Sequence, residues 1–289
     1  MRGESLAAGL KALLSKVDIC PRLILLDTPG ISATVPMLRG VWGAALRNLD
    51  SQAYEGVFVG IGPRNARTPS YVMRPSSYEP SASPDLEFIV IGRGIRYDNS
   101  IMRAWDSACG MGLGPQRRKF RRRTIHPISP CGALLSPTSH AVTWDLSVAP
   151  WPVPGGESAP CRLEFPTPLR LIRRGRLVEI PRLSELVIAG ARRLSAYLQP
   201  EDAASLQRLE DQMLEAVASL PGGPWRGERL DLVRYSGRQH GEIELRGVIG
   251  SLVLPQGPGE LWPLFAAARW LHLGKGTIMG LGKLEAVPI

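Results

Sequence analysis

The pattern of apolar and polar positions divides the first half of the chain into alternating strands and helices. Leucines at helical spacing predict a helix over residues 5–15, and a second amphipathic pattern predicts one over 37–48. Short apolar runs predict strands at 23–26, 54–61, 70–74 and 86–91, and a further helix is expected over 97–108. The helices are too few for repeated βαβ crossovers, so this order indicates a ferredoxin-like α+β unit.

The second half of the chain repeats the same order of elements. Strands are expected at 161–165, 169–173, 230–235, 242–245, 248–254 and 284–287, with helices over 183–198, 201–220 and 260–271. The fold class predicted is therefore α+β, with two tandem ferredoxin-like (RRM-like) domains and a C-terminal glycine-rich loop. A segment rich in proline and glycine separates them, which gives domains over 1–147 and 161–289 and a linker over 148–160.

Composition narrows the classes of function. The 289 residues include 35 Lys and Arg against 26 Asp and Glu, and a net charge of +9 favours nucleic acid as a partner. No apolar run is long enough to span a membrane and no signal peptide is evident, so we expect a cytoplasmic protein without a membrane partner. The four cysteines are too scattered for a zinc site, and we expect reduced thiols, no metal and no cofactor.

The stretch 271–283 is a basic, glycine-rich loop. Its glycines and lysines are Gly274, Gly276, Gly280, Gly282, Lys275 and Lys283. Glycines let a backbone approach an anion with its N–H groups free to donate. The Walker pattern fails because Lys275 is followed by Gly276, and the dinucleotide pattern fails because the loop precedes a strand. We therefore predict contact with a polymeric phosphate backbone.

Other basic residues extend this prediction. The densest charge run contains Arg117, Arg118, Lys119, Arg121, Arg122 and Arg123. Its interpretation is phosphate contact, with a solvated basic face as the alternative. Phe120 lies inside the run and either stacks on an unpaired base or belongs to the core. Arg173 and Arg174 occupy a turn and are further candidates for RNA contact, while Arg39 lies off the apolar stripe of its helix, free for solvent or ligand.

Several segments, taken in order along nearly the whole chain, resemble one protein family. They are 38–40, 43–47, 69–75, 112–114, 234–239, 245–250, 272–277 and 280–283. Together they resemble the CRISPR-associated precursor-RNA processing endoribonucleases of the RAMP superfamily, numbered six among the Cas proteins. Arg238 and Gln239 match an Arg-Gln pair of that family, which implies RNA contact; their alternative is a surface salt bridge with Glu242 or Glu244.

The resemblance implies a function and partners. Members of that family cleave CRISPR repeat RNA without a metal: the ribose 2′-OH attacks the phosphorus in line and leaves a 2′,3′-cyclic phosphate and a 5′-OH. The implied function is an endoribonuclease that recognises a hairpin of the repeat RNA through the basic run and the glycine-rich loop, produces guide RNA and stays bound to it. The implied partners are CRISPR repeat RNA, crRNA and other Cas proteins of an effector complex.

The catalytic residues are the point at which this sequence departs from the family. The family commonly carries a catalytic histidine on or just after the first helix of the N-terminal half, whereas residues 35–54 contain none. Arg47 and Tyr54 stand in that region instead. His272 and Lys275, at the glycine-rich loop, are the other catalytic candidates, and the alternative for His272 is a structural histidine that caps the preceding helix.

Three functions therefore remain after the sequence alone. The first is the endoribonuclease, and the second is a non-catalytic guide-RNA-binding subunit with the same fold. The third, an unrelated tandem RNA-recognition-motif protein, is disfavoured because aromatic residues make up only 6% of the chain. Of the remaining histidines, His240 lies in a turn that is a candidate for RNA contact, and we expect no role for His126 and His140.

Overall fold

A computed structural model of the chain describes residues 5–60, 67–77, 85–138, 140–236 and 241–289, and for 232–236 and 241–245 it describes the backbone alone. The chain divides into two compact units. The C-terminal unit comprises Met1–Lys16, Ala149–Thr277 and Leu281–Ile289. The N-terminal unit comprises Val17–Val148 and Ile278–Gly280.

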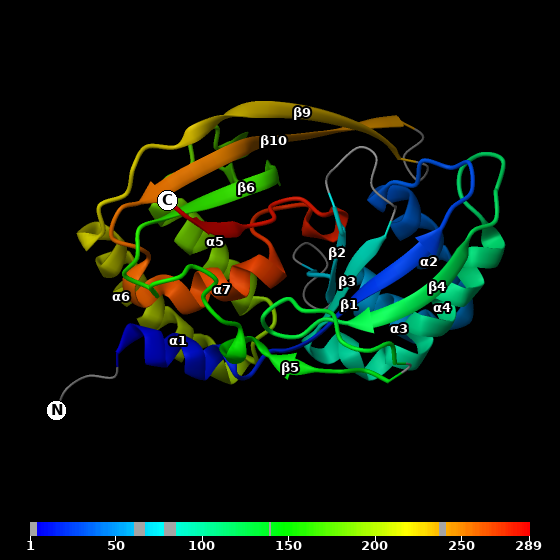
Figure 1. Cartoon of the computed structure of the whole chain (residues 1–289), viewed down its shortest axis with the longest axis horizontal. Coiled ribbons are helices and arrows are strands. Elements are labelled where there is room, and N and C mark those ends of the chain that lie inside the picture. Colours follow the sequence, from blue (N-terminus) through cyan, green and yellow to red (C-terminus); the bar gives the residue numbers. More distant parts are fainter. Residues whose placement is uncertain (1–4, 61–66, 78–84, 139, 237–240) are drawn as a thin grey trace. The chain divides into compact units, whose positions relative to one another are not determined.

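The N-terminal unit has the ferredoxin-like order of elements. These are β1 (Asp18–Asp27), α2 (Val35–Leu49), β2 (Tyr71–Pro75), β3 (Leu86–Ile91), α4 (Asp98–Met111) and β4 (Arg121–Pro127). The sheet order is β2-β3-β1-β4 with antiparallel pairing, and the short β5 (Trp144–Asp145) pairs with β1 (Figure 1). Helices α2 and α4 pack together, with Trp42 5.9 Å from Trp105 and 5.1 Å from Phe88 between ring centroids. These rings form the centre of the core.

The strand predicted over 54–61 is wrong. The chain instead forms the short helix α3 (Ser51–Ala53), followed by a π-helix over Tyr54–Val59 that ends at Gly60. Asp50 caps this segment, because its carboxylate accepts a hydrogen bond of 2.9 Å from the amide of Ala53. The local pattern of apolar residues is also compatible with a helix, and removing this strand leaves the βαββαβ order intact.

The C-terminal unit repeats the ferredoxin-like topology. Its elements are α1 (Leu6–Leu14), β6 (Cys161–Leu169), β7 (Ile172–Arg173), β8 (Arg176–Leu177), α5 (Leu183–Ser195), α6 (Ala203–Ser219), β9 (Arg226–Ser236), β10 (Gly241–Leu254), α7 (Trp262–Leu271) and β11 (Glu285–Pro288). The sheet order is β11-β6-β10-β9, and Figure 1 shows β9 and β10 as a long antiparallel pair. The predicted fold class is confirmed.

Short 3-10 helices connect several of these elements. They cover Gly92–Tyr97, Leu146–Val148, Pro200–Asp202, Gly259–Leu261 and Thr277–Met279. The two strands expected at 242–245 and 248–254 are a single strand, because a register shift between Val248 and Gly250 lets β10 bend without ending. None of the helices in the described ranges is long and apolar enough to cross a membrane.

At the N-terminus, the boundary between the two units differs from the predicted domain boundary. Helix α1 belongs to the C-terminal unit, where Leu6 and Leu10 are buried in its core. Figure 1 shows α1 beside α7, and the amide of Leu6 donates a hydrogen bond of 3.0 Å to Glu260. The predicted linker over 148–160 starts where the units meet along the chain, between Val148 and Ala149.

Candidate nucleic-acid interface

The glycine-rich loop begins where helix α7 ends, at His272. This residue has a φ of 60°, and its amide donates to the carbonyl of Ala268 at 2.8 Å, so it caps the helix. Its ring Nδ1 lies 2.9 Å from the carbonyl oxygen of Leu281, which only accepts, so Nδ1 carries the proton. The side chain is 0% exposed. Of the two roles predicted for His272, this geometry fits the structural cap. The bond from its ring to Leu281 also connects the two ends of the loop.

The glycines of the loop are required by its backbone. Gly274, Gly276, Gly280 and Gly282 have φ values of 79°, 84°, 82° and 68°, in the left-handed region that side chains disfavour. A Cβ on Gly282 would lie 1.9 Å from the carbonyl oxygen of Leu273, and one on Gly274 would lie 2.6 Å from that of Arg170. The loop therefore depends on glycine for both conformation and close packing.

Two amides of the loop remain available to a ligand. Five others after His272 are used within the C-terminal unit, in the bonds Leu273 N to Gly282 O, Lys275 N to Arg170 O, Leu281 N to Gly276 O, Gly282 N to Pro168 O and Lys283 N to Thr167 Oγ1. The amides of Gly274 and Gly276 have no hydrogen-bond partner among the residues that the structure describes. Both residues are partly exposed. Two unpaired amides that are separated by one residue can both donate to a phosphate group.

The cations around this loop differ in availability. Lys275 is exposed and has no ion-pair partner in the described part of the chain. Lys283 is predominantly buried and pairs with Glu285 at 2.6 Å, so its charge is partly balanced. Arg170, which the sequence reasoning missed, anchors the loop through its carbonyl, and its buried Nε has no partner within the described ranges. A single arginine after a strand carries no sequence signal of this role.

Arg39, Arg47 and Tyr54 belong to the N-terminal unit, around the π-helix. The sequence predicted that Arg39 is free for solvent or ligand, but its side chain is held in place. Its Nε donates to the hydroxyl of Tyr71 at 2.8 Å, and its guanidinium carbon lies 4.1 Å from the centroid of Phe58. Arg47 is exposed, with its guanidinium carbon 5.9 Å from the centroid of Tyr54. The structure thus places these two catalytic candidates close to each other.

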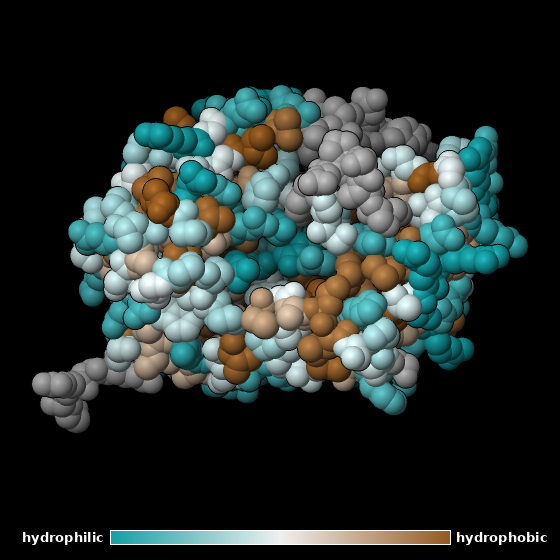
Figure 2. All heavy atoms as spheres, in the orientation of Figure 1, coloured by the Kyte–Doolittle hydropathy of each residue, from teal (hydrophilic) through white to brown (hydrophobic). Residues whose placement is uncertain are grey.

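The basic run lies on β4 and on the turn that precedes it. In Figure 2, hydrophilic residues gather along the right-hand edge of the view, where Figure 1 places this turn and β4. Arg118 donates to the carbonyl of Gly30 at 2.9 Å, and Arg122 donates to Asp106 at 3.0 Å. The exposed members with neither an ion-pair nor a side-chain hydrogen-bond partner in the described ranges are Arg117, Lys119, Arg121 and Arg123. Phe120 is only 2% exposed and part of the core, so it offers no stacking surface.

The remaining predicted residues are more scattered. Arg173 and Arg174 are exposed at the turn between β7 and β8, where Arg173 lies 3.4 Å from Glu185. Gly280 groups with the N-terminal unit. Arg238 and Gln239, together with His240, lie outside the described residues.

The histidines expected to play no part are local features of the N-terminal unit. His126 has its ring Nδ1 3.1 Å from the carbonyl of Leu135. His140 is exposed.

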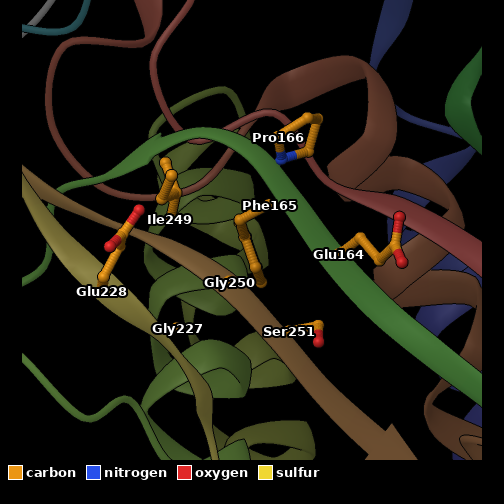
Figure 3. Close-up of a pocket in the computed structure, with 8 residues that line it drawn as sticks. All are labelled: Glu164, Phe165, Pro166, Gly227, Glu228, Ile249, Gly250 and Ser251. Atoms are coloured by element: carbon orange, nitrogen blue, oxygen red, sulfur yellow. The ribbon is translucent and has the colours of Figure 1, made fainter.

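A pocket on the sheet of the C-terminal unit is a poor match for phosphate. It has a volume of about 540 Å³, and Figure 3 shows its lining residues on β6, β9 and β10, beside the register shift of β10. Two of the lining side chains, Glu164 and Glu228, are carboxylates that would repel an anion. This pocket is therefore not part of the candidate interface.

No group of three or more histidine, cysteine, aspartate or glutamate side chains within the described ranges is arranged to hold a metal ion. All four cysteines are free thiols. Cys20 and Cys161 are buried, and burial raises the pKa of each thiol to about 11. Cys131 is exposed.

Comparison with known proteins agrees with the resemblance seen in the sequence. Residues 163–284 match the model of the CRISPR-associated endoribonuclease Cas6 family, which confirms that resemblance over this part of the chain. No curated protein matches the chain.

Solved structures of Cas6 proteins have the same fold as the whole chain. A Cas6 (TTHB231) product complex aligns at 16% identity with a TM-score of 0.57, covering 95% of this chain and all of that one. Thermus thermophilus Cas6 (TTHB231) aligns at 15% identity with a TM-score of 0.55, covering 94% and 99%. A Cas6-RT-Cas1–Cas2 complex aligns at 12% identity with a TM-score of 0.57, covering 95% of this chain and 29% of that chain. Both ferredoxin-like units are included in these matches.

Proposed function

We propose that this chain, whose residues 163–284 match the Cas6 family and whose fold is that of Cas6 proteins, is an endoribonuclease that processes CRISPR repeat RNA. The observation that supports RNA binding most directly is the pair of unpaired amides at Gly274 and Gly276 beside the exposed Lys275. They lie inside the segment that matches the family.

This arrangement suits an RNA backbone. Amides held in a left-handed turn form a concave donor site for phosphate oxygens, and a lysine beside them supplies positive charge. Arg170, whose carbonyl anchors the same loop, is a second cation of this unit next to the loop in the backbone pairing. The exposed arginines of the basic run add sequence-independent attraction to a polyanion. We therefore assign RNA retention to the loop and general attraction to the basic run.

Cleavage in this proposal requires no metal ion. The 2′-oxygen of the nucleotide before the scissile bond attacks the phosphorus, the P–O5′ bond breaks, and the products are a 2′,3′-cyclic phosphate and a 5′-OH. The 2′-OH proton leaves the attacking oxygen, and the 5′-oxygen gains a proton. Alignment and stabilisation of the extra negative charge lower the barrier. Each unit offers its own candidates for this chemistry: Lys275 is an exposed cation of the C-terminal unit, and Arg47 is an exposed cation of the N-terminal unit beside the Tyr54 hydroxyl, a candidate for proton transfer.

One observation favours a second candidate function, a crRNA-binding subunit without cleavage activity. His272 is 0% exposed, and residues 35–54 contain no histidine. In the described part of the chain, therefore, neither the first helix of the N-terminal unit nor the glycine-rich loop presents an accessible imidazole. Other Cas proteins are proposed partners in either case, since one structural neighbour is a Cas6-RT-Cas1–Cas2 complex.

An assay of the purified protein with the repeat RNA of its own CRISPR array, in EDTA, tests this proposal. The expected result is a single cleavage with a 2′,3′-cyclic phosphate on the upstream product. A 2′-deoxy nucleotide at the cleavage position is the matched control and is expected to block the reaction. Tight binding without product would establish the second candidate, and the absence of both binding and cleavage would overturn both.

A further inference from the structure

The N-terminal unit contains a group of arginine side chains on aromatic rings, of which the proposed cleavage chemistry uses only the Arg47 guanidinium and the Tyr54 hydroxyl. This arginine–aromatic cluster is defined by three pairs: Arg39 with Phe58, Arg47 with Tyr54, and Arg96 with Tyr97. The rings are connected through the π-helix. Tyr54 stacks on Phe58 at 5.0 Å with an interplanar angle of 17°, and Tyr97 packs against Gly56, where a Cβ would lie 2.8 Å from its ring.

The inner part of the cluster is structural. Phe58 is wedged against α2 at Gly43, where a Cβ would lie 2.2 Å from the ring. Its other neighbours are the buried Tyr71, at 5.9 Å between centroids, and Arg39, whose guanidinium carbon is 4.1 Å from its centroid. Phe58 is therefore a fixed support for whatever stacks on it.

The outer part of the cluster is open. Tyr54 is partly exposed, stacks near-parallel on Phe58, and has the Arg47 guanidinium over its ring. The guanidinium of Arg47 is 5.9 Å from the Tyr54 centroid, well beyond the 4.1 Å of the packed Arg39 pair. Because Arg47 is exposed, a small movement of its side chain would admit a planar group between guanidinium and ring.

The backbone that presents Tyr54 is unusual. Tyr54 and Phe58 lie on the π-helix, which ends at Gly60 with a φ of 95°. A Cβ there would lie 2.1 Å from the carbonyl oxygen of Thr68, so only glycine fits. π-helical turns are rare and occur frequently at functional sites. The local geometry thus holds a partly exposed aromatic ring on a packed support.

We propose that Tyr54 and Arg47 bind an unpaired base of the RNA, a nucleotide that flanks the repeat hairpin. The base stacks on the ring of Tyr54, Arg47 covers it or contacts its phosphate, and Arg96 provides a second cation nearby. Aromatic rings and guanidinium planes are the usual partners of unstacked bases in RNA-binding proteins. This inference deepens the proposed function and rests on it, and it gives the Tyr54 ring a role separate from any role of its hydroxyl.

The test compares two RNAs, the repeat hairpin with its unpaired flanks and the hairpin alone, with 2-aminopurine placed at each flanking position in turn. For the wild type, we expect the flanked RNA to bind more tightly and 2-aminopurine at one position to be quenched. Tyr54→Ala is expected to weaken binding of the flanked RNA by about tenfold and to remove the quenching. Binding of the hairpin alone should be unchanged. Tyr54→Phe, which keeps the ring, should retain both signals.

Arg103→Ala is the matched control, because Arg103 is an exposed arginine of α4 outside the cluster. It should leave the difference between the two RNAs intact. If Tyr54→Ala proves unstable, Arg47→Ala, a change at an exposed position, is expected to reduce the same difference.

Several outcomes would overturn the inference. Equal weakening of both RNAs by Tyr54→Ala would make the residue structural, and equal damage by Tyr54→Phe would assign its effect to the hydroxyl. A wild type that binds the hairpin equally with and without flanks would reject this inference but keep the proposed function. A wild type that binds neither RNA would reject both.

Discussion

At the scale of the residue, His272 is defined by its burial and its backbone conformation. A histidine at a φ of 60° occupies a conformation more usual for glycine, and its ring joins the helix end to the carbonyl of Leu281. The sequence showed that a histidine stands next to the glycine-rich loop, but adjacency in sequence does not reveal which way a ring points. Both of its predicted roles were therefore compatible with the sequence alone.

Replacing this histidine should lower stability. His272→Ala removes a buried hydrogen bond and leaves the carbonyl of Leu281 without its donor, so the free energy of unfolding should fall by about 1–3 kcal/mol. Urea denaturation measures the change. His272→Asn is the control, because asparagine tolerates a left-handed backbone and keeps a donor. Unchanged stability of His272→Ala together with lost cleavage would instead indicate a catalytic residue.

The cysteines should differ sharply in reactivity. The hydroxyl of Ser129, 3.1 Å from Sγ of Cys131, lowers the pKa of that exposed thiol, with the amide of Ala133 as a second cause. Burial raises the pKa of Cys20 and of Cys161 to about 11. Titration of the native protein with a disulfide reagent at neutral pH should show one fast thiol, since the thiolate is the reactive form. A fast phase that persists in Cys131→Ser would contradict this assignment.

At the scale of the element, the π-helix and the glycine-rich loop show where sequence patterns stop being sufficient. Residues 54–61 have aromatic and β-branched side chains that favour a strand, yet the cap at Asp50 and the packing of Phe58 on α2 select a helix. The order of strands and helices was predictable because apolar periodicity follows the core. At residues 54–61, tertiary contacts override the local preference for a strand.

The glycine-rich loop should tolerate no side chain at its tightest position. Gly282→Ala places a Cβ 1.9 Å from the carbonyl oxygen of Leu273 at a φ of +68°. Gly132→Ala is the matched control, because Gly132 has a φ of +90° with open space around its Cβ position. The free energy of unfolding of the control should fall by about 1–2 kcal/mol from backbone strain alone, and that of Gly282→Ala should fall substantially more. Equal losses in thermal or urea denaturation would show that the loop can relax around the new methyl group.

The stability that the Asp50 cap contributes to the segment before the π-helix should depend on pH. The hydroxyl of Ser100 lowers the pKa of Asp50, with the amide of Ala53 as the second cause. Because the pKa is lower in the folded state, the carboxylate stabilises the protein above the unfolded value of 3.8, and this contribution is lost as the pH falls.

Asp50→Asn, which still offers a capping oxygen, is the comparison. The stability difference between wild type and variant should be largest near neutral pH and shrink below about pH 4. A difference that is constant from pH 7 to pH 3 would contradict the role of the charge.

At the scale of the whole molecule, the sequence predicted two ferredoxin-like units, and both are present. It located the glycine-rich loop and the basic run from composition, because glycine and cation content is visible without coordinates. It could not locate Arg170, whose contribution depends on a backbone contact between β6 and the loop. Nor could it separate Arg39, held by Tyr71 and Phe58, from the exposed Arg47, since both lie off the apolar stripe of one helix.

The central claim is that the glycine-rich loop holds the phosphate backbone of repeat RNA, and the salt dependence of binding to Lys275→Ala tests it most directly. Arg192→Ala, a change at an exposed arginine of α5, is the matched loss of charge in the same unit. If Lys275 contacts a phosphate, the slope of log affinity against log salt concentration should become shallower by about 1, whereas Arg192→Ala should keep the wild-type slope. A Lys275→Ala variant with the affinity and slope of the wild type would contradict the account.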